Sequence, residues 1–203
     1  MTAAEELELV AAEVAACTDC KLHLSRKSAV PGEGPTDAEL LFIGEGPGFH
    51  ENEQGRPFVG AAGNFLEELL ASIGLSREEV FITNIVKCRP PGNRDPQAEE
   101  IEACSAYLER QTRSLNPKVV VTLGRFSMAR FFPNARISAI HGNAQRIGDR
   151  IVVPMYHPAA ALHQPSLRQT IHVDFARLPE LIGREARPMR AEDPPDMEQL
   201  SLF

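Results

Sequence analysis

The chain has no apolar run that approaches the roughly 18 residues of a membrane-spanning helix, although 43% of its 203 residues are hydrophobic. It also lacks an N-terminal basic segment followed by an apolar one, the arrangement typical of a secretory signal. No internal repeat is visible. From these absences we expect a cytoplasmic, monomeric protein with one globular domain and no membrane segment.

Basic residues are missing from both ends of the chain. Residues 1–16 and 191–203 together hold eight acids and no base, which accounts for the formal net charge of −7. Residues 17–190 are close to neutral, with 20 acids against 21 bases, and 17 of those bases are Arg. Because Arg suits forked contacts with phosphate, the acidic balance does not exclude a nucleic-acid partner.

Short apolar runs alternate with helical patterns along the chain. The runs typical of buried strands cover residues 39–44, 80–86, 118–123 and 151–155. Helical spacing covers residues 5–16, 61–73, 96–115, 126–132 and 166–182. The alternation predicts an α/β fold with three layers (α/β/α), in which helices cover a four-stranded, mainly parallel sheet. We expect residues 1–183 to form this domain and the polar, Pro-rich residues 184–203 to form a flexible tail.

Chemically distinctive residues follow the predicted strands. A glycine-rich loop, Gly44-Glu-Gly-Pro-Gly48, comes after the first strand. Asn84 lies near the end of the second strand, and His157 follows the fourth. Ligands of parallel α/β sheets bind outside the carboxyl ends of the strands. We therefore expect these segments to meet at one edge and to form the functional site.

The four cysteines form one pattern: Cys17 and Cys20 are separated by two residues, and Cys88 and Cys104 by fifteen. Buried free thiols would explain Cys88 and Cys104, but Cys17 and Cys20 stand in a polar setting beside Lys21. Disulfides are rare in a cytosolic chain. The pattern therefore predicts a four-thiolate metal site, and the spacing is compatible with zinc and with an iron–sulfur cluster alike.

Four segments carry a resemblance to a known family: Gly44-Glu-Gly-Pro-Gly48, Gly55-Arg-Pro-Phe-Val-Gly60, Thr83-Asn-Ile-Val-Lys-Cys-Arg-Pro-Pro-Gly-Asn93 and His157-Pro-Ala-Ala-Ala-Leu162. In this order they resemble the family 4 uracil-DNA glycosylases of bacteria and archaea, over most of the chain. The resemblance implies a uracil-DNA glycosylase-like fold and a [4Fe–4S] cluster on the four cysteines. It also implies a monofunctional enzyme that hydrolyses the N-glycosidic bond of deoxyuridine in DNA, leaving an abasic site for base excision repair.

The resemblance also implies roles for the pocket residues. Phe58 would stack on the extruded uracil, and Asn84 would accept from uracil N3–H while donating to O4. His157 would donate to uracil O2 as negative charge builds there. Gly46 would offer its backbone N–H, and it stands where related families carry an Asp.

Two carboxylates align with pocket residues of the family. Glu45 and Glu51 would position water or stabilise the cationic sugar. We interpret Glu53, the third acid of the same loop, as a solvated surface charge.

The resemblance further implies contacts with DNA. Leu162 would fill the gap left by the extruded base, and His163 stands where many members have Arg. Arg89, Arg94 and Arg168 are candidate contacts with the phosphate backbone.

The C-terminal peptide resembles the short segment by which bacterial repair proteins bind the sliding clamp. Leu200, Leu202 and Phe203 would enter an apolar groove, and Gln199 would make a polar contact.

Three other functions are compatible with these motifs. One is a clamp-tethered, non-catalytic binder of damaged or single-stranded DNA. Another is a relative that becomes covalently trapped on the abasic product through a histidine in an inserted basic loop. No such insertion is visible after Cys88, where Arg-Pro-Pro-Gly-Asn follows, which counts against this alternative. The third is a zinc protein acting on free nucleotides.

Overall fold

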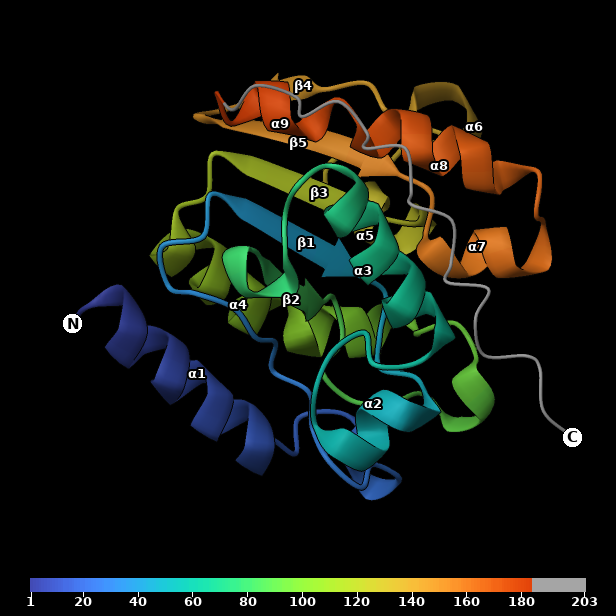
Figure 1. Cartoon of the computed structure of the whole chain (residues 1–203). Helices are drawn as coiled ribbons and strands as arrows, with labels where there is room; N and C mark the ends of the chain where they lie inside the picture. Colours follow the sequence, from blue (N-terminus) through green and yellow to red (C-terminus); the bar gives the residue numbers. More distant parts are fainter. Residues whose placement is uncertain (184–203) are drawn as a thin grey trace, which may run out of the picture.

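A five-stranded sheet forms the centre of the molecule, with strand order β2-β1-β3-β5-β4 (Figure 1). The computed structural model describes residues 1–183, so the predicted tail lies outside the described residues. The strands are β1 (Leu40–Gly44), β2 (Phe81–Asn84), β3 (Val119–Leu123), β4 (Gln145–Ile147) and β5 (Arg150–Met155). The first four strands in the spatial order run parallel, and β4 pairs antiparallel with β5.

Alternate side chains of the central strands enter two separate hydrophobic cores. Phe42 of β1 packs in the core that contains Leu66 and Phe175, whereas its neighbour Leu41 packs in the core that contains Leu108. All five residues of β1 and of β3 are buried. A strand that is covered on both faces reads as a continuous apolar run, which explains why the sequence pattern located these strands.

Helices cover both faces of the sheet, as expected for three layers. They are α1 (Ala3–Ala16), α2 (Phe49–Gln54), α3 (Ala61–Ser72), α4 (Ala98–Leu115), α5 (Arg125–Ala129), α6 (Ile137–Ile140), α7 (Pro158–His163), α8 (Leu167–Phe175) and α9 (Leu178–Leu181). Helix α3 packs with α7 and α8. Helix α1 packs against α4, and Arg110 of α4 forms ion pairs with Glu6 and Glu13 of α1.

The predicted strand count was wrong by one, because β4 was not expected. Its three residues, Gln145–Ile147, are all exposed, and it lies at the edge of the sheet. A strand without a buried face shows no hydrophobic alternation. The predicted helix over residues 166–182 is also divided into α8 and α9.

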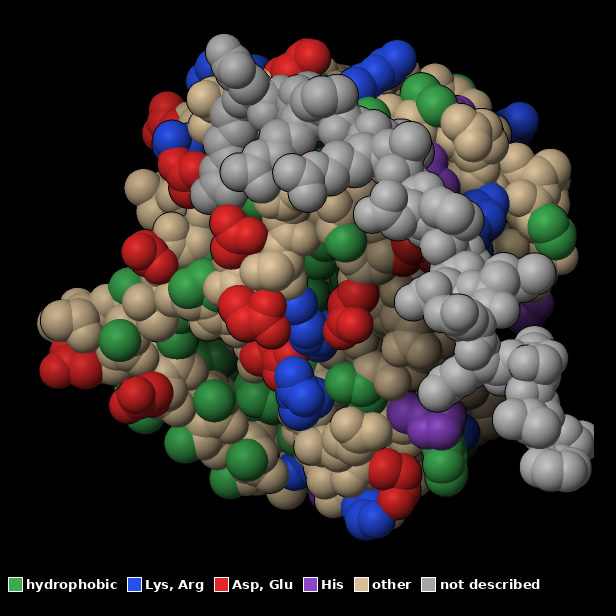
Figure 2. Space-filling view, viewed as in Figure 1, with side chains coloured by type: hydrophobic (Ala, Val, Ile, Leu, Met, Phe, Trp, Pro, Cys, Tyr) green, Lys and Arg blue, Asp and Glu red, His purple; other side chains and the backbone are tan. Residues whose placement is uncertain are grey.

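Two short helices surround the functional edge of the sheet. Helix α2 interrupts the glycine-rich segment after β1; it begins after Gly48 and ends at Gly55, which has a φ of 72°. Helix α7 begins directly after His157. In residues 1–183 no helix is both long and apolar enough to cross a membrane. On the face seen in Figure 2, acidic and basic side chains lie side by side near the centre.

Candidate active site

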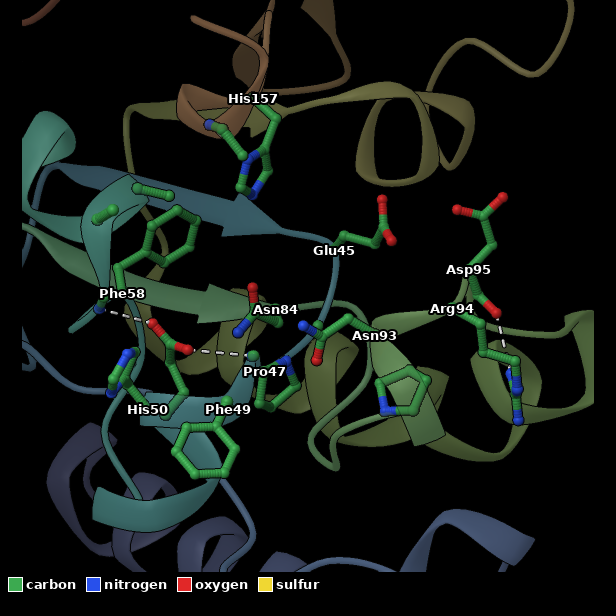
Figure 3. A pocket seen from close by; sticks show the side chains of 18 of the residues that line it. Glu45, Pro47, Phe49, His50, Phe58, Asn84, Asn93, Arg94, Asp95 and His157 are labelled. Atoms are coloured by element: carbon green, nitrogen blue, oxygen red, sulfur yellow. Dashed lines mark hydrogen bonds between the residues drawn. The ribbon is translucent and has the colours of Figure 1, made fainter. Parts of the chain in front are cut away.

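A cavity of about 710 Å³ opens at the carboxyl ends of β1, β2 and β5. Six predicted site residues line it together: Glu45, Gly46, Glu51, Phe58, Asn84 and His157. Figure 3 shows Phe58, Asn84, Glu45 and His157 around the same space. The loop after β1, Asn84 and His157 therefore meet at one edge of the sheet, as expected, and Glu51 and Phe58 line the same cavity.

Asn84 ends β2 and is 2% exposed. Its side-chain oxygen, Oδ1, is buried and has no hydrogen-bond partner among the described residues. A buried acceptor without a partner is destabilising by about 1–3 kcal/mol, so it marks a position where a ligand can donate. Gly44 leaves the necessary room, since a Cβ there would lie 2.3 Å from this oxygen.

Lys87 holds Asn84 from the side away from the cavity. Lys87 is 1% exposed, and its Nζ atom donates to the Asn84 carbonyl (2.9 Å), to Thr83 Oγ1 (2.6 Å) and to Gln111 Oε1 (2.7 Å). Sequence analysis missed this residue, because a Lys within a polar motif resembles a surface residue. These three acceptors hold the Lys87 amine and fix the end of β2 beneath the cavity.

Phe58 has an unusual backbone conformation, with a φ of 52°. Non-glycine residues rarely adopt positive φ values, and such strain persists only where surrounding contacts impose it. Arg77 imposes it here, because its guanidinium donates to the Phe58 carbonyl (2.8 Å) and to the Pro57 carbonyl. Gly63 allows the close approach, since a Cβ there would lie 1.9 Å from the Phe58 oxygen.

The Phe58 ring is 5% exposed and stacks against His157, with centroids 5.4 Å apart and planes at 24°. The Nδ1 atom of His157 accepts a hydrogen bond from the Ala159 N–H (3.1 Å). Burial lowers the pKa of His157 to about 4, and the charge of Glu51 opposes this shift only in part. The imidazole is therefore neutral at pH 7 and carries its proton on Nε2, which is available as a donor.

Glu51 connects the two ends of the segment from Gly48 to Gly60. Its carboxylate accepts from the backbone N–H groups of Val59 (2.8 Å), Gly60 (3.1 Å) and Gly48 (3.1 Å). These bonds occupy both carboxylate oxygens, so the geometry favours a structural role for Glu51.

Glu45 is half-buried at the cavity and makes no side-chain hydrogen bond within residues 1–183. Burial raises the pKa of Glu45, and the charge of Asp95 acts in the same direction, whereas Arg125 opposes both. Glu45 is therefore better placed than Glu51 to act on a water molecule. Gly46, the next residue, brings the backbone close to β2: a Cβ there would lie 2.7 Å from Val86 Cγ2.

The four cysteines line a second, small cavity beside Lys87. All four are free thiols, and Arg26 Nη1 donates to Cys88 Sγ at 3.2 Å. Burial raises the pKa of Cys20 and Cys88, and raises that of Cys104 to about 11. Among the described residues no three His, Cys, Asp or Glu side chains close around a single metal ion. Four thiols that line one small cavity are the donor set of a thiolate-bound metal or iron–sulfur group.

The predicted DNA contacts differ in their surroundings. Leu162 of α7 is 45% exposed, and its neighbour His163 lines the cavity. Arg168 pairs with Glu68 and lies over the Phe65 ring.

The other two arginines lie closer to the cavity. Arg94 lines it but pairs with Glu100 (2.6 Å). Arg89 has no carboxylate partner within residues 1–183 and donates to Asn93 Oδ1 (2.7 Å). Of these three arginines and Leu162, Arg94, Arg168 and Leu162 are exposed, whereas Arg89 is half-buried.

Comparisons with known proteins identify the family. The model of the uracil DNA glycosylase superfamily matches residues 31–177. The type-4 uracil-DNA glycosylase of Sulfurisphaera tokodaii is 48% identical over 187 residues, which cover 87% of this chain and 85% of that protein. The type-4 enzyme of Saccharolobus solfataricus is also 48% identical, over 88% of each chain. That of Archaeoglobus fulgidus is 46% identical, over 89% of this chain and 96% of its own. The chain belongs to the uracil DNA glycosylase superfamily and, within it, to the type-4 family.

Proposed function

We propose that the protein is a monofunctional uracil-DNA glycosylase. It hydrolyses the N-glycosidic bond of deoxyuridine in DNA, releases uracil and leaves an abasic site for base excision repair. The observation that carries this proposal is the buried Oδ1 of Asn84, which has no partner within residues 1–183 and lies in a cavity large enough for a nucleobase.

Uracil is recognised at its Watson–Crick edge by Asn84. Oδ1 accepts from uracil N3–H, and the side-chain amide donates to O4. Cytosine presents the opposite pattern, so it leaves buried groups unpaired at about 1–3 kcal/mol each. The rigid Phe58 ring supplies a flat apolar surface for stacking.

The bond between C1′ and N1 breaks with its electron pair passing to uracil, whose negative charge is shared by O2 and O4. The neutral His157 donates from Nε2 to O2 and stabilises this charge. Because the Ala159 N–H fixes the tautomer, the donor needs no reorganisation during the reaction. The Gly46 N–H is a second candidate donor.

Water completes the reaction at the sugar. Glu45 positions the water and takes its proton as the new C1′–O bond forms, while its negative charge stabilises the oxocarbenium-like sugar. Glu51 supports the loop in the way described above. Among the cavity-lining residues of the described chain none is Lys, so a Schiff-base lyase step has no suitable amine.

Cys17, Cys20, Cys88 and Cys104 are proposed to hold the [4Fe–4S] cluster implied by family membership. The cluster would join the segment after α1 to the segment after β2 and to α4, so its contribution is structural. The hydrogen bond from Arg26 to Cys88 Sγ supports this assignment, because donors to sulfur accompany such clusters.

DNA is proposed to bind across the cavity mouth, with the exposed Leu162 entering the gap left by uracil and with Arg89 and Arg168 close to phosphates. The C-terminal Gln199, Leu200, Leu202 and Phe203 are proposed to bind the sliding clamp. Deleting residues 199–203 should remove clamp binding and leave the cleavage of free oligonucleotides unchanged.

The activity is tested with a uracil-containing oligonucleotide that is treated with hot alkali after incubation. The wild-type protein should produce strand cleavage, and His157→Ala and Asn84→Ala should reduce it strongly. Intact strands with the metal-replete protein would overturn the proposal. A covalent protein–DNA adduct would instead indicate the trapped relative, and tight binding without uracil release would indicate a non-catalytic binder.

A further inference from the structure

Phe49 is the only aromatic residue among the exposed large apolar side chains of residues 1–183. Its side chain is 53% exposed at the first position of α2. Single exposed apolar residues are common on protein surfaces. The surroundings of Phe49 therefore decide whether this exposure has a function.

Phe49 lines the cavity, and Figure 3 shows it on the side opposite His157. The Arg89 guanidinium lies over the Phe49 ring, 5.3 Å from the ring centroid. The bond from Arg89 Nε to Asn93 Oδ1 holds this guanidinium in place. The His50 ring packs against the Phe49 ring in an edge-to-face arrangement, with the ring centroids 5.5 Å apart and the ring planes at 83°. The ring is thus fixed at the cavity rim by two neighbours and still keeps about half of its surface open to solvent.

We propose that Phe49 and Arg89 bind the nucleotide adjacent to the extruded deoxyuridine, an inference that rests on the proposed function. The base of that nucleotide stacks on the open part of the Phe49 ring, and Arg89 contacts its phosphate. Extrusion of uracil removes a stacking partner from each neighbouring base, and an exposed aromatic ring replaces such a partner. Every base has a flat π-face, so the site requires a base but does not select its identity.

Binding of single-stranded oligonucleotides tests this inference. The probe contains 2′-fluoro-2′-deoxyuridine, which resists hydrolysis, and the dissociation constant is measured by fluorescence anisotropy. Phe49→Ala should weaken binding about 5- to 150-fold, the range expected for the loss of one base–aromatic stack. Phe49→Trp should restore binding. Leu9→Ala provides the control, because Leu9 is exposed on α1 away from the cavity.

A second probe identifies the nucleotide. Two versions of this probe are needed: one lacks the base of the 5′ neighbour of the fluorinated nucleotide, and the other lacks the base of the 3′ neighbour. Both keep the backbone intact. The effect of Phe49→Ala should disappear with one of these probes. Equal binding of Phe49→Ala and wild type to the complete probe would overturn the inference, and so would an effect of Phe49→Ala that stays the same with each of the two abasic probes. If the wild type releases uracil and Phe49→Ala binds the probe as tightly as the wild type, this inference fails but the proposed function stands. If the wild type releases no uracil, the proposed function itself is contradicted.

Discussion

Replacement of Asn84 by Leu separates the stability of this protein from its activity. Leu keeps the branched shape of Asn but removes the buried oxygen that has no partner in residues 1–183. Because that oxygen destabilises the folded state by about 1–3 kcal/mol, Asn84→Leu should unfold at an equal or higher denaturant concentration than the wild type. The backbone contact with Lys87 is unaffected, since it involves the Asn84 carbonyl.

The same substitution should remove most of the activity. Uracil N3–H and O4 lose their partners in the closed site, at about 1–3 kcal/mol each. The combined loss of about 2–6 kcal/mol corresponds to a decrease in kcat/KM of about 30-fold to about 2 × 10⁴-fold. The assay is uracil release from an oligonucleotide followed by alkaline cleavage, together with urea unfolding of the same preparation.

Thr122 provides a matched control. Its Oγ1 atom is also buried and has no partner in the described part of the chain, but it lies in β3 and does not line the cavity. Thr122→Val should therefore be at least as stable as the wild type in urea unfolding, and its kcat/KM should stay within about twofold of the wild-type value. The reasoning is refuted if Asn84→Leu is less stable than the wild type by more than about 1 kcal/mol, or if it keeps kcat/KM within threefold.

Three further predictions concern the other parts of the site. In the Glu45→Gln variant, the rate of single-turnover uracil release should stay constant between about pH 8 and pH 5 and should fall at lower pH with an apparent pKa near 4. The reason is that protonation of His157 at Nδ1 breaks the hydrogen bond that this atom accepts from the Ala159 N–H. A midpoint near 6.5 would contradict this prediction. Glu51→Gln should lower the free energy of unfolding by about 1–3 kcal/mol in urea melts, since an amide NH₂ replaces one acceptor; a large fall in kcat at unchanged stability would instead assign Glu51 to water activation. Cys104→Ser should remove the absorbance near ~400 nm and the bound iron; a colourless wild type that contains zinc would contradict the cluster.

Sequence patterns identified most of the fold for a simple physical reason. Strands β1 and β3 are buried on both faces, so nearly every residue in them is apolar. The short motifs at the carboxyl ends of the parallel strands had to meet at one edge of the sheet, which correctly grouped Glu45, Asn84 and His157. Strand β4 was missed because its three side chains are all exposed.

Other features depend on contacts between distant residues and leave no local pattern. Helix α2 interrupts a segment with many glycines, and it is supported by bonds from Glu51 to the far end of the same loop. The buried position of Lys87 requires Gln111 from α4 as an acceptor. The strained φ of Phe58 requires Arg77. Each of these contacts joins residues that are at least eight positions apart, so no sliding pattern of hydrophobicity detects them.

The contacts that support the cavity also explain its preference for a neutral base over a phosphate. Glu45, Glu51 and Asp95 line the cavity and repel an anion on entry, and Arg94, the one arginine that lines it within residues 1–183, is paired with Glu100. Negative charge on uracil appears only as the glycosidic bond breaks, when the neutral donor of His157 is already in place. A donor whose dipole is oriented before the reaction stabilises the developing charge without further reorganisation. The site therefore stabilises the leaving group more strongly than the bound substrate, which is the condition for a higher rate constant.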